Sequence, residues 1–187
     1  HSNLGGVFTK QGRLDEAIAH FAEALRIEPD FADAHNNLGY ELARRRKFEE
    51  AIEHYTEALR IKPNFADAYY NLGVALARQG KLDEAITYFN KAIQIKPDEA
   101  EVYYNLGVTL AFQGKFDEAI TNFKEAVRIK PGLADAHYNL GAALAIQGKL
   151  DEAIIHFTEA LQIRPDFIDA RRGLEKALLL QKNKSKK

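Results

Sequence analysis

The chain has no cysteine and no methionine among its 187 residues, and it has only five prolines. The absence of cysteine excludes disulfide bonds and thiolate metal sites. No apolar run approaches the ~20 residues that a membrane-spanning helix needs, and no signal peptide is visible. A chain without even a first methionine is expected to be a processed product or a piece of a longer protein. Its compartment stays open, with the cytoplasm as the default.

Charge and glycine distribution argue against several classes of function. The formal net charge is −1 and the isoelectric point is near 6.7, so the chain lacks the basic footprint of a nucleic-acid-binding protein. The glycines at the helix turns occur singly, so there is no phosphate-cradling loop. No Ser/His/Asp arrangement has local support. We therefore expect no catalytic residues, no cofactor and no enzyme activity.

The few prolines recur at a constant spacing of 34 residues. They are Pro29, Pro63, Pro97, Pro131 and Pro165. A fixed period of this length indicates a solenoid, in which each repeat packs on its neighbours. The predicted units are 1–31, which lacks its opening residues, 32–65, 66–99, 100–133 and 134–167, followed by a capping helix at 168–181 and a basic tail at 182–187.

Each unit reads as two helices joined by a turn. In 66–99, Ala68, Leu72 and Leu76 share one face of a first helix, and Ala85 and Phe89 begin the apolar stripe of a second. The fold class is therefore all-α. Small residues also recur inside the helices, and we interpret them as close packing between helices: Gly39, Gly73, Gly107 and Gly141, with Ala51, Ala85, Ala119 and Ala153. The bulky partners are Tyr55, Phe89, Phe123 and Phe157.

The helix ends carry recurrent signals. Asp98 followed by Glu101 predicts a capping box at the start of a first helix. The same pattern recurs at Asp30/Asp33, Asn64/Asp67 and Asp166/Asp169, and Gly132/Asp135 lacks the capping side chain. Gly12, Gly80, Gly114 and Gly148 fall just past the first helices, where a left-handed residue is favoured. Arg46 takes that place in the second unit and predicts a local misfit.

These residues resemble the tetratricopeptide repeat family. The resemblance rests on the Leu-Gly pairs at 38–39, 72–73, 106–107 and 140–141, and on sets such as Ala85, Phe89, Ala92 and Pro97 that recur in phase. It implies a right-handed superhelix whose first helices line a concave groove that binds a protein or peptide. Pentatricopeptide RNA binders share the period but lack this proline and small-residue signature. A lone terminal helix commonly caps such arrays.

One asparagine per unit lies on the predicted inner face: Asn3, Asn37, Asn71, Asn105 and Asn139. Asparagine is a poor helix former, and its amide can both donate to and accept from a peptide bond. The row is similar to the asparagine ladder in the repeat arm of the O-linked N-acetylglucosamine transferases, although no glycosyltransferase domain is present. The alternative is that each amide satisfies a neighbouring helix.

Three further rows complete the predicted groove. Tyr70, Tyr104 and Tyr138 offer contact area, with packing between repeats as the alternative. An acidic row that includes Asp67 and Glu101 is explained chiefly by capping, and would favour a basic segment if it faced the groove. The far rim changes from Arg44 and Arg78 to Phe112 and Ile146, so the C-terminal half should expose more apolar surface.

Acidic residues and asparagine occupy the places where chaperone-binding members carry a Lys and Arg clamp. We therefore expect no binding of chaperone tails. The run Arg44–Lys47 has two readings: it complements a helix dipole, or it docks an acidic partner or phosphate.

Six histidines fall at two repeat positions, 19 residues apart: His1 and His20, His35 and His54, His137 and His156. They lack the i, i+4 spacing of zinc-binding pairs, so we expect packing or surface roles and no metal site.

The sequence thus predicts a non-catalytic scaffold that binds an extended segment in its groove. The alternatives are a structural solenoid that associates end to end, or the recognition arm of a larger enzyme.

Overall fold

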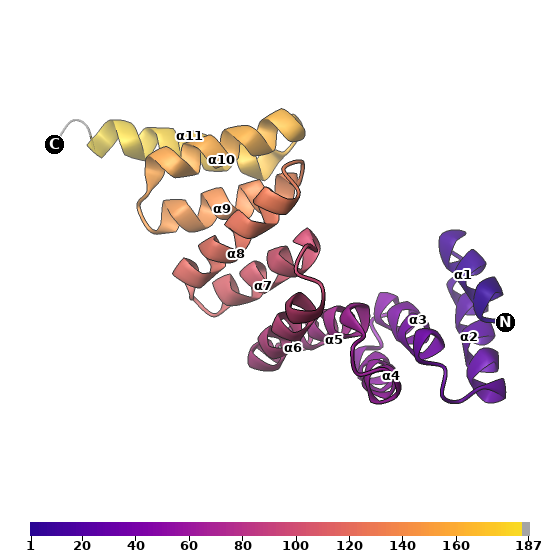
Figure 1. Ribbon diagram of the computed structural model, residues 1–187. Helices are drawn as coiled ribbons and strands as arrows, with labels where there is room; N and C mark the ends of the chain where they lie inside the picture. Colours follow the sequence, from indigo (N-terminus) through magenta and orange to yellow (C-terminus); the bar gives the residue numbers. More distant parts are fainter. Residues whose placement is uncertain (185–187) are drawn as a thin grey trace. The chain divides into compact units, whose positions relative to one another are not determined.

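The computed structural model describes residues 1–184, and these residues form helices and turns without a strand (Figure 1). The helices are α1 Ser2–Lys10, α2 Leu14–Ile27, α3 Ala32–Arg44, α4 Phe48–Ile61, α5 Ala66–Arg78, α6 Leu82–Ile95, α7 Ala100–Phe112, α8 Phe116–Ile129, α9 Ala134–Ile146, α10 Leu150–Ile163 and α11 Ile168–Lys184. The predicted all-α solenoid of helix–turn–helix units is confirmed.

The chain divides into two compact units, His1–Pro97 and the residues from Asp98 onward. In the first unit, α1/α2, α3/α4 and α5/α6 form helical hairpins, and the first helices α1, α3 and α5 also contact one another in sequence. The second unit repeats this arrangement with α7/α8 and α9/α10, and α11 packs against α10 and α9. Adjacent first helices therefore create one surface in each unit.

The turns inside the hairpins contain the predicted left-handed residues. Gly80 has φ +80° and Gly114 has φ +77°. Arg46 adopts φ +63° at the equivalent place, and it is the only non-glycine residue with positive φ among those described. The predicted misfit at Arg46 is confirmed, because this conformation brings Cβ too close to the backbone in an L-residue.

Glycines within the first helices lie directly against aromatic rings of the second helices. A Cβ added to Gly107 would lie 2.7 Å from a ring carbon of Phe123, which is 1% exposed. At Gly73 the corresponding contact with Phe89 is 2.8 Å. The packing interpretation of these glycines is confirmed, and the close approach explains why the helices tolerate a residue of poor helix propensity.

The predicted capping boxes are wrong. The N-cap residues of α3, α5, α7 and α9 are Phe31, Phe65, Glu99 and Leu133, and none makes a side-chain capping hydrogen bond. Asp98 lies in the turn before the N-cap residue of α7. The helix starts after the Pro–Asp turn, so the acidic side chain is too early in the chain to accept the first helical N–H groups.

The last helix, α11, buries Ala170 and Ala177 and continues to Lys184. A helix that caps the end of a solenoid is expected to have a polar outer side. The outer side of α11 is partly apolar, because Leu179 is 60% exposed and Ile168 is 64% exposed. The predicted basic tail begins within this helix, and its final residues, from Ser185 to Lys187, lie outside the described residues.

Candidate functional site

A hollow of about 590 Å³ opens between α3 and α5 in the first unit. Four residues predicted for the groove border it, namely Arg44, Tyr70, Asn71 and Arg78. The rest of the lining consists of Tyr40, Ala43, Arg46, Phe48, Tyr55, Val74 and Ala75. We refer to it as the α3/α5 hollow. Its lining combines aromatic rings with three arginines, so it offers cationic and apolar contacts together.

The second unit has two hollows in equivalent places. The α7/α9 hollow, of about 240 Å³, includes Phe112, Asn139 and Ile146. The α9/α11 hollow, of about 430 Å³, includes Tyr138 and Ile146 with Arg172 and Lys176. The predicted exposure of apolar surface here is confirmed, because Phe112 is 79% and Ile146 is 63% exposed.

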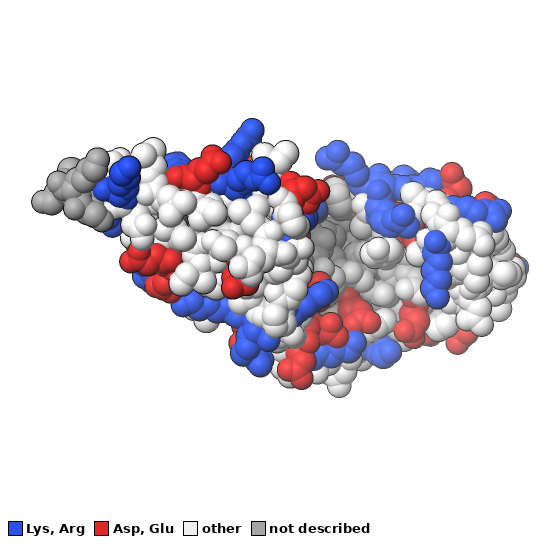
Figure 2. Space-filling view, turned by 90° about the horizontal axis from the view of Figure 1, so that it is seen from above, with Lys and Arg blue, Asp and Glu red and all other residues white. Residues whose placement is uncertain are grey.

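The two units therefore differ in the chemistry of their hollows. The α3/α5 hollow has three arginines in its lining, whereas the described residues that line the α7/α9 hollow include no charged side chain. Lys and Arg side chains appear at several points along one edge of the N-terminal unit, at the right of Figure 2. The α3/α5 hollow therefore offers positively charged side chains to a ligand, whereas the α7/α9 hollow offers mainly apolar side chains.

Three of the five predicted asparagines use their amide N–H groups within the protein. Asn71 donates to Asn36 Oδ1 at 3.0 Å, and Asn139 donates to the Tyr104 hydroxyl at 3.1 Å. Asn105 donates to the backbone carbonyl of Glu101 at 2.8 Å. Two of these bonds join successive first helices, so the amides support the solenoid itself.

The other two asparagines are placed differently. Asn3 is exposed on α1 and borders a separate hollow of about 320 Å³ with Ile27 and Phe31. Asn37 is half-buried on α3. The row is therefore regular in sequence, but its five members do not share one environment.

The tyrosine row packs against the buried rings of the second helices. Tyr70 lies 6.2 Å from Phe89 between ring centroids, and Tyr138 lies 6.0 Å from Phe157. Tyr104 packs on Phe123 in the same way, and burial raises the pKa of its hydroxyl. Tyr70 and Tyr138 border hollows as well, so a tyrosine at this position can combine packing with access to a ligand.

The acidic row forms ion pairs with cations at the far end of the same hairpin. Asp67 lies 2.9 Å from Lys96 Nζ, and Glu101 lies 2.6 Å from Lys130 Nζ. Asp33 with Lys62 and Asp135 with Arg164 repeat the arrangement. The hydrogen bond from Lys130 lowers the pKa of Glu101. Each carboxylate thus links the two helices at the open end of its hairpin. The sequence had predicted helix capping as the main role of these residues.

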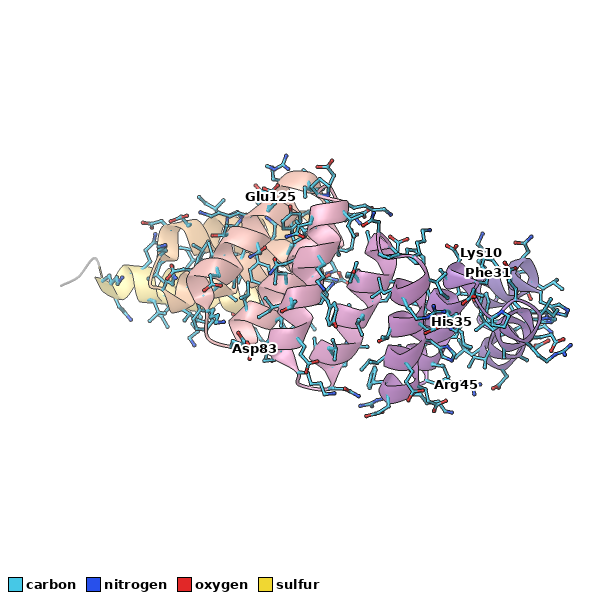
Figure 3. The ribbon with its side chains drawn as sticks, turned by 60° about the horizontal axis from the view of Figure 1, so that its bottom comes forward. Lys10, Phe31, His35, Arg45, Asp83 and Glu125 are labelled. Carbon is cyan, nitrogen blue, oxygen red and sulfur yellow. The ribbon has the colours of Figure 1, made fainter. Side chains whose placement is uncertain are left out.

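The basic run Arg44–Lys47, at the end of α3, is divided among separate partners. Arg44 pairs with Glu41 at 3.0 Å, Arg45 pairs with Asp15, and Lys47 pairs with Glu50 at 3.0 Å. Figure 3 labels Arg45 just beyond the end of α3. Arg46 turns to the α3/α5 hollow. The run is therefore not one cationic patch, and only Arg44 and Arg46 belong to the hollow.

The histidines meet in pairs, which the spacing argument missed. His35 Nδ1 lies 3.0 Å from His54 Nδ1, and His137 Nδ1 lies 3.2 Å from His156 Nδ1. Antiparallel helices of one hairpin bring residues 19 apart in sequence side by side. His35 is labelled in Figure 3. Within residues 1–184 no cluster of three or more metal-ligating side chains forms.

Burial and the neighbouring imidazole lower the pKa of His54 and of His156. Burial is the larger cause at both positions, because a partly buried imidazolium loses hydration. The lowered pKa favours the neutral form of His54 and of His156. In each pair, one ring donates its Nδ1–H to the Nδ1 of the other.

Arg46 and Tyr55 are among the residues of the α3/α5 hollow that the sequence did not predict as site residues. Arg46 was noted only as a misfit, and Tyr55 only as packing. The available signal was the departure of the second repeat from the others, which have glycine in place of Arg46 and phenylalanine in place of Tyr55. This departure indicates a candidate site only once the structure shows that both residues border one hollow.

None of the helices in the described part of the chain has the length and apolar character required to cross a membrane.

Tetratricopeptide repeat models match residues 36–100 and 104–166, and a further repeat model matches residues 5–45. A search of curated proteins found no match. The likeness to the repeat arm of the O-linked N-acetylglucosamine transferases stays a prediction.

Solved structures of similar fold include YrrB, described as a TPR protein with an unusual peptide-binding site, at 26% identity, TM-score 0.77 and coverage of 93% of this chain and 90% of that one. MamA is 28% identical with a TM-score of 0.79, over 86% of this chain and 94% of its own. TTC0263, a thermophilic TPR protein of Thermus thermophilus, is 26% identical with a TM-score of 0.71, over 95% of this chain and 97% of its own. The matched models cover most of the chain, and together with the helical hairpins they establish that it belongs to the tetratricopeptide repeat family.

Proposed function

We propose that the chain is a non-catalytic scaffold that binds an extended segment of another protein along the inner faces of its first helices. Binding by such a surface requires contact area and hydrogen-bonding groups at regular intervals, which an extended peptide can match residue by residue. The partner is a protein or peptide. Nucleic acid is not expected, because the chain has a net charge of −1.

The observation that supports this proposal is the recurrence of hollows at equivalent repeat positions. Asn71, Val74 and Arg78 border the α3/α5 hollow from α5. The residues 68 positions later, Asn139, Ala142 and Ile146, border the α7/α9 hollow from α9. A surface that is repeatedly hollowed while its side chains vary is suited to partner recognition, because the scaffold stays constant and the lining sets the specificity.

Two further facts support the proposal. YrrB, which shares the fold over most of its length, has a peptide-binding site by its description. In addition, Phe112 and Ile146 expose apolar surface that intramolecular packing does not cover. Large exposed apolar side chains of this kind often mark a binding site.

A peptide library displayed on phage tests the proposal. The wild-type chain is expected to select peptides, and Phe112→Ala with Ile146→Ala should weaken the capture of those that carry apolar side chains by about tenfold, equivalent to ~1.4 kcal/mol. The matched control is Ile155→Ala with Ile163→Ala, which removes exposed apolar groups from α10. Failure of the wild-type chain to select any peptide would contradict the proposal.

A further inference from the structure

The second repeat departs from the common pattern at positions that gather around one hollow. Glu41 stands where the next three repeats have Ala75, Thr109 and Ala143. Arg46 replaces a glycine, and Tyr55 replaces a phenylalanine. Arg46 and Tyr55 both border the α3/α5 hollow, and Glu41 pairs with Arg44, which also borders it.

Arg46 carries the strongest physical argument. It has φ +63°, whereas the four equivalent residues of the other repeats are glycines with φ between 70° and 80°. A long side chain in this conformation destabilises the turn, and strain of this kind tends to persist at functional sites. In return for this strain, Arg46 brings a guanidinium group to the hollow, which glycine could not provide.

Glu41 holds a second arginine in place. Its side chain is fully buried, with one carboxylate oxygen 3.0 Å from Arg44 Nη1 and the other without a hydrogen-bond partner among the described residues. A buried carboxylate is costly unless it is paired. The pair neutralises most of the Arg44 charge and fixes that side chain at the edge of the hollow.

Arg46 and Arg78 differ from most other arginines of the chain. Arg13, Arg26, Arg60, Arg128 and Arg164 each pair with an intramolecular carboxylate. In the part of the chain that the structure describes, Arg46 and Arg78 have no such ion pair. The α3/α5 hollow therefore carries about two uncompensated positive charges beside Tyr40 and Tyr70.

We propose that the α3/α5 hollow binds the carboxylate side chains of an acidic segment in the partner protein, with Arg46 and Arg78 as the groups that contact the carboxylates. Arginine suits this role because its planar guanidinium binds carboxylates through two parallel hydrogen bonds. Tyr40 and Tyr70 supply apolar area for the aliphatic parts of the segment, and the buried Tyr55 also belongs to the lining. This inference rests on the proposed function and specifies the chemistry of the partner.

The test starts from the same phage-displayed library. Peptides selected by the wild-type chain are expected to be enriched in Asp and Glu, and synthetic copies of them should bind more weakly as salt rises. In fluorescence polarisation, Arg46→Gly and Arg78→Gln should each weaken the acidic peptides about tenfold, and a Glu→Gln copy of each peptide should show a similar loss. Inorganic phosphate and a phosphoserine copy serve as competing probes.

Two controls separate binding from folding. Arg45→Gln removes one positive charge next to Arg46 but outside the hollow, and it should leave binding nearly unchanged. Arg46→Gly restores the residue of the other repeats, so it should raise the melting temperature while it weakens binding.

The possible outcomes distinguish this inference from the proposed function. Selected peptides without acidic enrichment, or acidic peptides that bind Arg46→Gly and Arg78→Gln as well as wild type, would overturn the inference and leave the scaffold proposal intact. Preference for the phosphoserine copy with no binding of the carboxylate peptides would also overturn it. If no peptide is selected at all, both proposals fail.

Discussion

At the scale of single residues, the same amino acid has opposite roles in this chain according to what lies beside it. Gly107 faces the Phe123 ring, and an added Cβ would lie 2.7 Å from it. Gly6 lies in α1, and an added Cβ would meet nothing within 4 Å. Glycine lowers helix stability at both places by ~1 kcal/mol relative to alanine, but only Gly107 has a steric reason to be there.

Gly107→Ala is therefore expected to destabilise the protein by about 1–2 kcal/mol. Overpacking of a dense core costs about 1–3 kcal/mol, which exceeds the gain in helix propensity, and the buried Phe123 ring has little room to shift. Gly6→Ala is the control and should be neutral or stabilising. Urea unfolding of the two variants measures the difference, and equal stability of both would show that the ring accommodates the methyl group.

Arg46→Gly is expected to stabilise the protein by about 0.5–1 kcal/mol. The left-handed conformation at φ +63° costs an L-residue about 1–2 kcal/mol, and glycine avoids this cost while it loses more entropy on folding. The converse change, Gly80→Ala, should destabilise, because Gly80 has φ +80°. Thermal and urea unfolding of both variants provide the measurement. A loss of stability in Arg46→Gly would mean that the arginine makes contacts that outweigh its strain.

At the scale of helices and hairpins, the sequence predicted the elements well and their electrostatic links poorly. The helices and the glycine turns follow from apolar periodicity and from residues such as Gly80 and Phe89, which act locally or at fixed spacing. The ion pair between Asp67 and Lys96 joins residues 29 apart in sequence, whereas the local pattern predicted helix capping for the same aspartate. The antiparallel hairpin brings Lys96 close to Asp67, and the local sequence does not reveal this.

The histidine pairs should make the hairpins sensitive to acid. The pKa of His54 and that of His156 are lowered in the folded state, so the folded chain binds fewer protons than the unfolded chain. Stability from these groups is present above the unfolded pKa of about 6.5 and is lost as pH falls through the lower folded values. The carboxylates with lowered pKa, such as Glu101, act in a more acidic range, below their ordinary value of 4.5.

Several charged groups oppose or support this effect. Glu50 and Glu53 favour the protonated form of His54, and His35 disfavours it. At His156, Glu152 and Glu159 favour protonation, whereas His137 and Lys124 disfavour it. Because burial is the largest cause at both sites, the direction of the shift remains downward.

The urea midpoint measured from about pH 7.5 to about pH 5.5 tests this prediction across the range in which histidine titrates. The midpoint should fall with pH. The variant His35→Tyr with His54→Tyr copies the stacked Tyr69–Tyr88 pair, whose rings lie 6.1 Å apart, and it should show a smaller fall. An identical pH profile in wild type and variant would mean that the pair does not sense protonation.

At the scale of the whole molecule, the repeat pattern predicted several positions that border hollows but not how their side chains are used. Arg78, Phe112 and Ile146 do border hollows. Asn71 and Asn139, by contrast, donate hydrogen bonds to the neighbouring first helices. Periodicity identifies residues that share an environment, whereas the choice between a ligand and a neighbour depends on distances of a few ångströms.

If the lining alone sets the chemistry of each hollow, specificity should be transferable from one unit to the other. Phe112→Arg with Ile146→Arg places arginines in the α7/α9 hollow at the positions that Arg44 and Arg78 hold in the first unit. Both residues are largely exposed, so the substitutions should change stability by no more than about 0.5 kcal/mol.

The grafted variant is expected to bind a second equivalent of the acidic peptide in isothermal titration calorimetry. In a background that also carries Arg46→Gly and Arg78→Gln, the graft should restore binding that the background has lost, because the added guanidinium groups offer two positive charges to the carboxylates of the peptide. Phe112→Gln with Ile146→Gln is the matched control, polar but uncharged. If the graft restores nothing while the protein stays folded, charge in a hollow is insufficient, and the strained geometry of Arg46 must itself be part of the recognition.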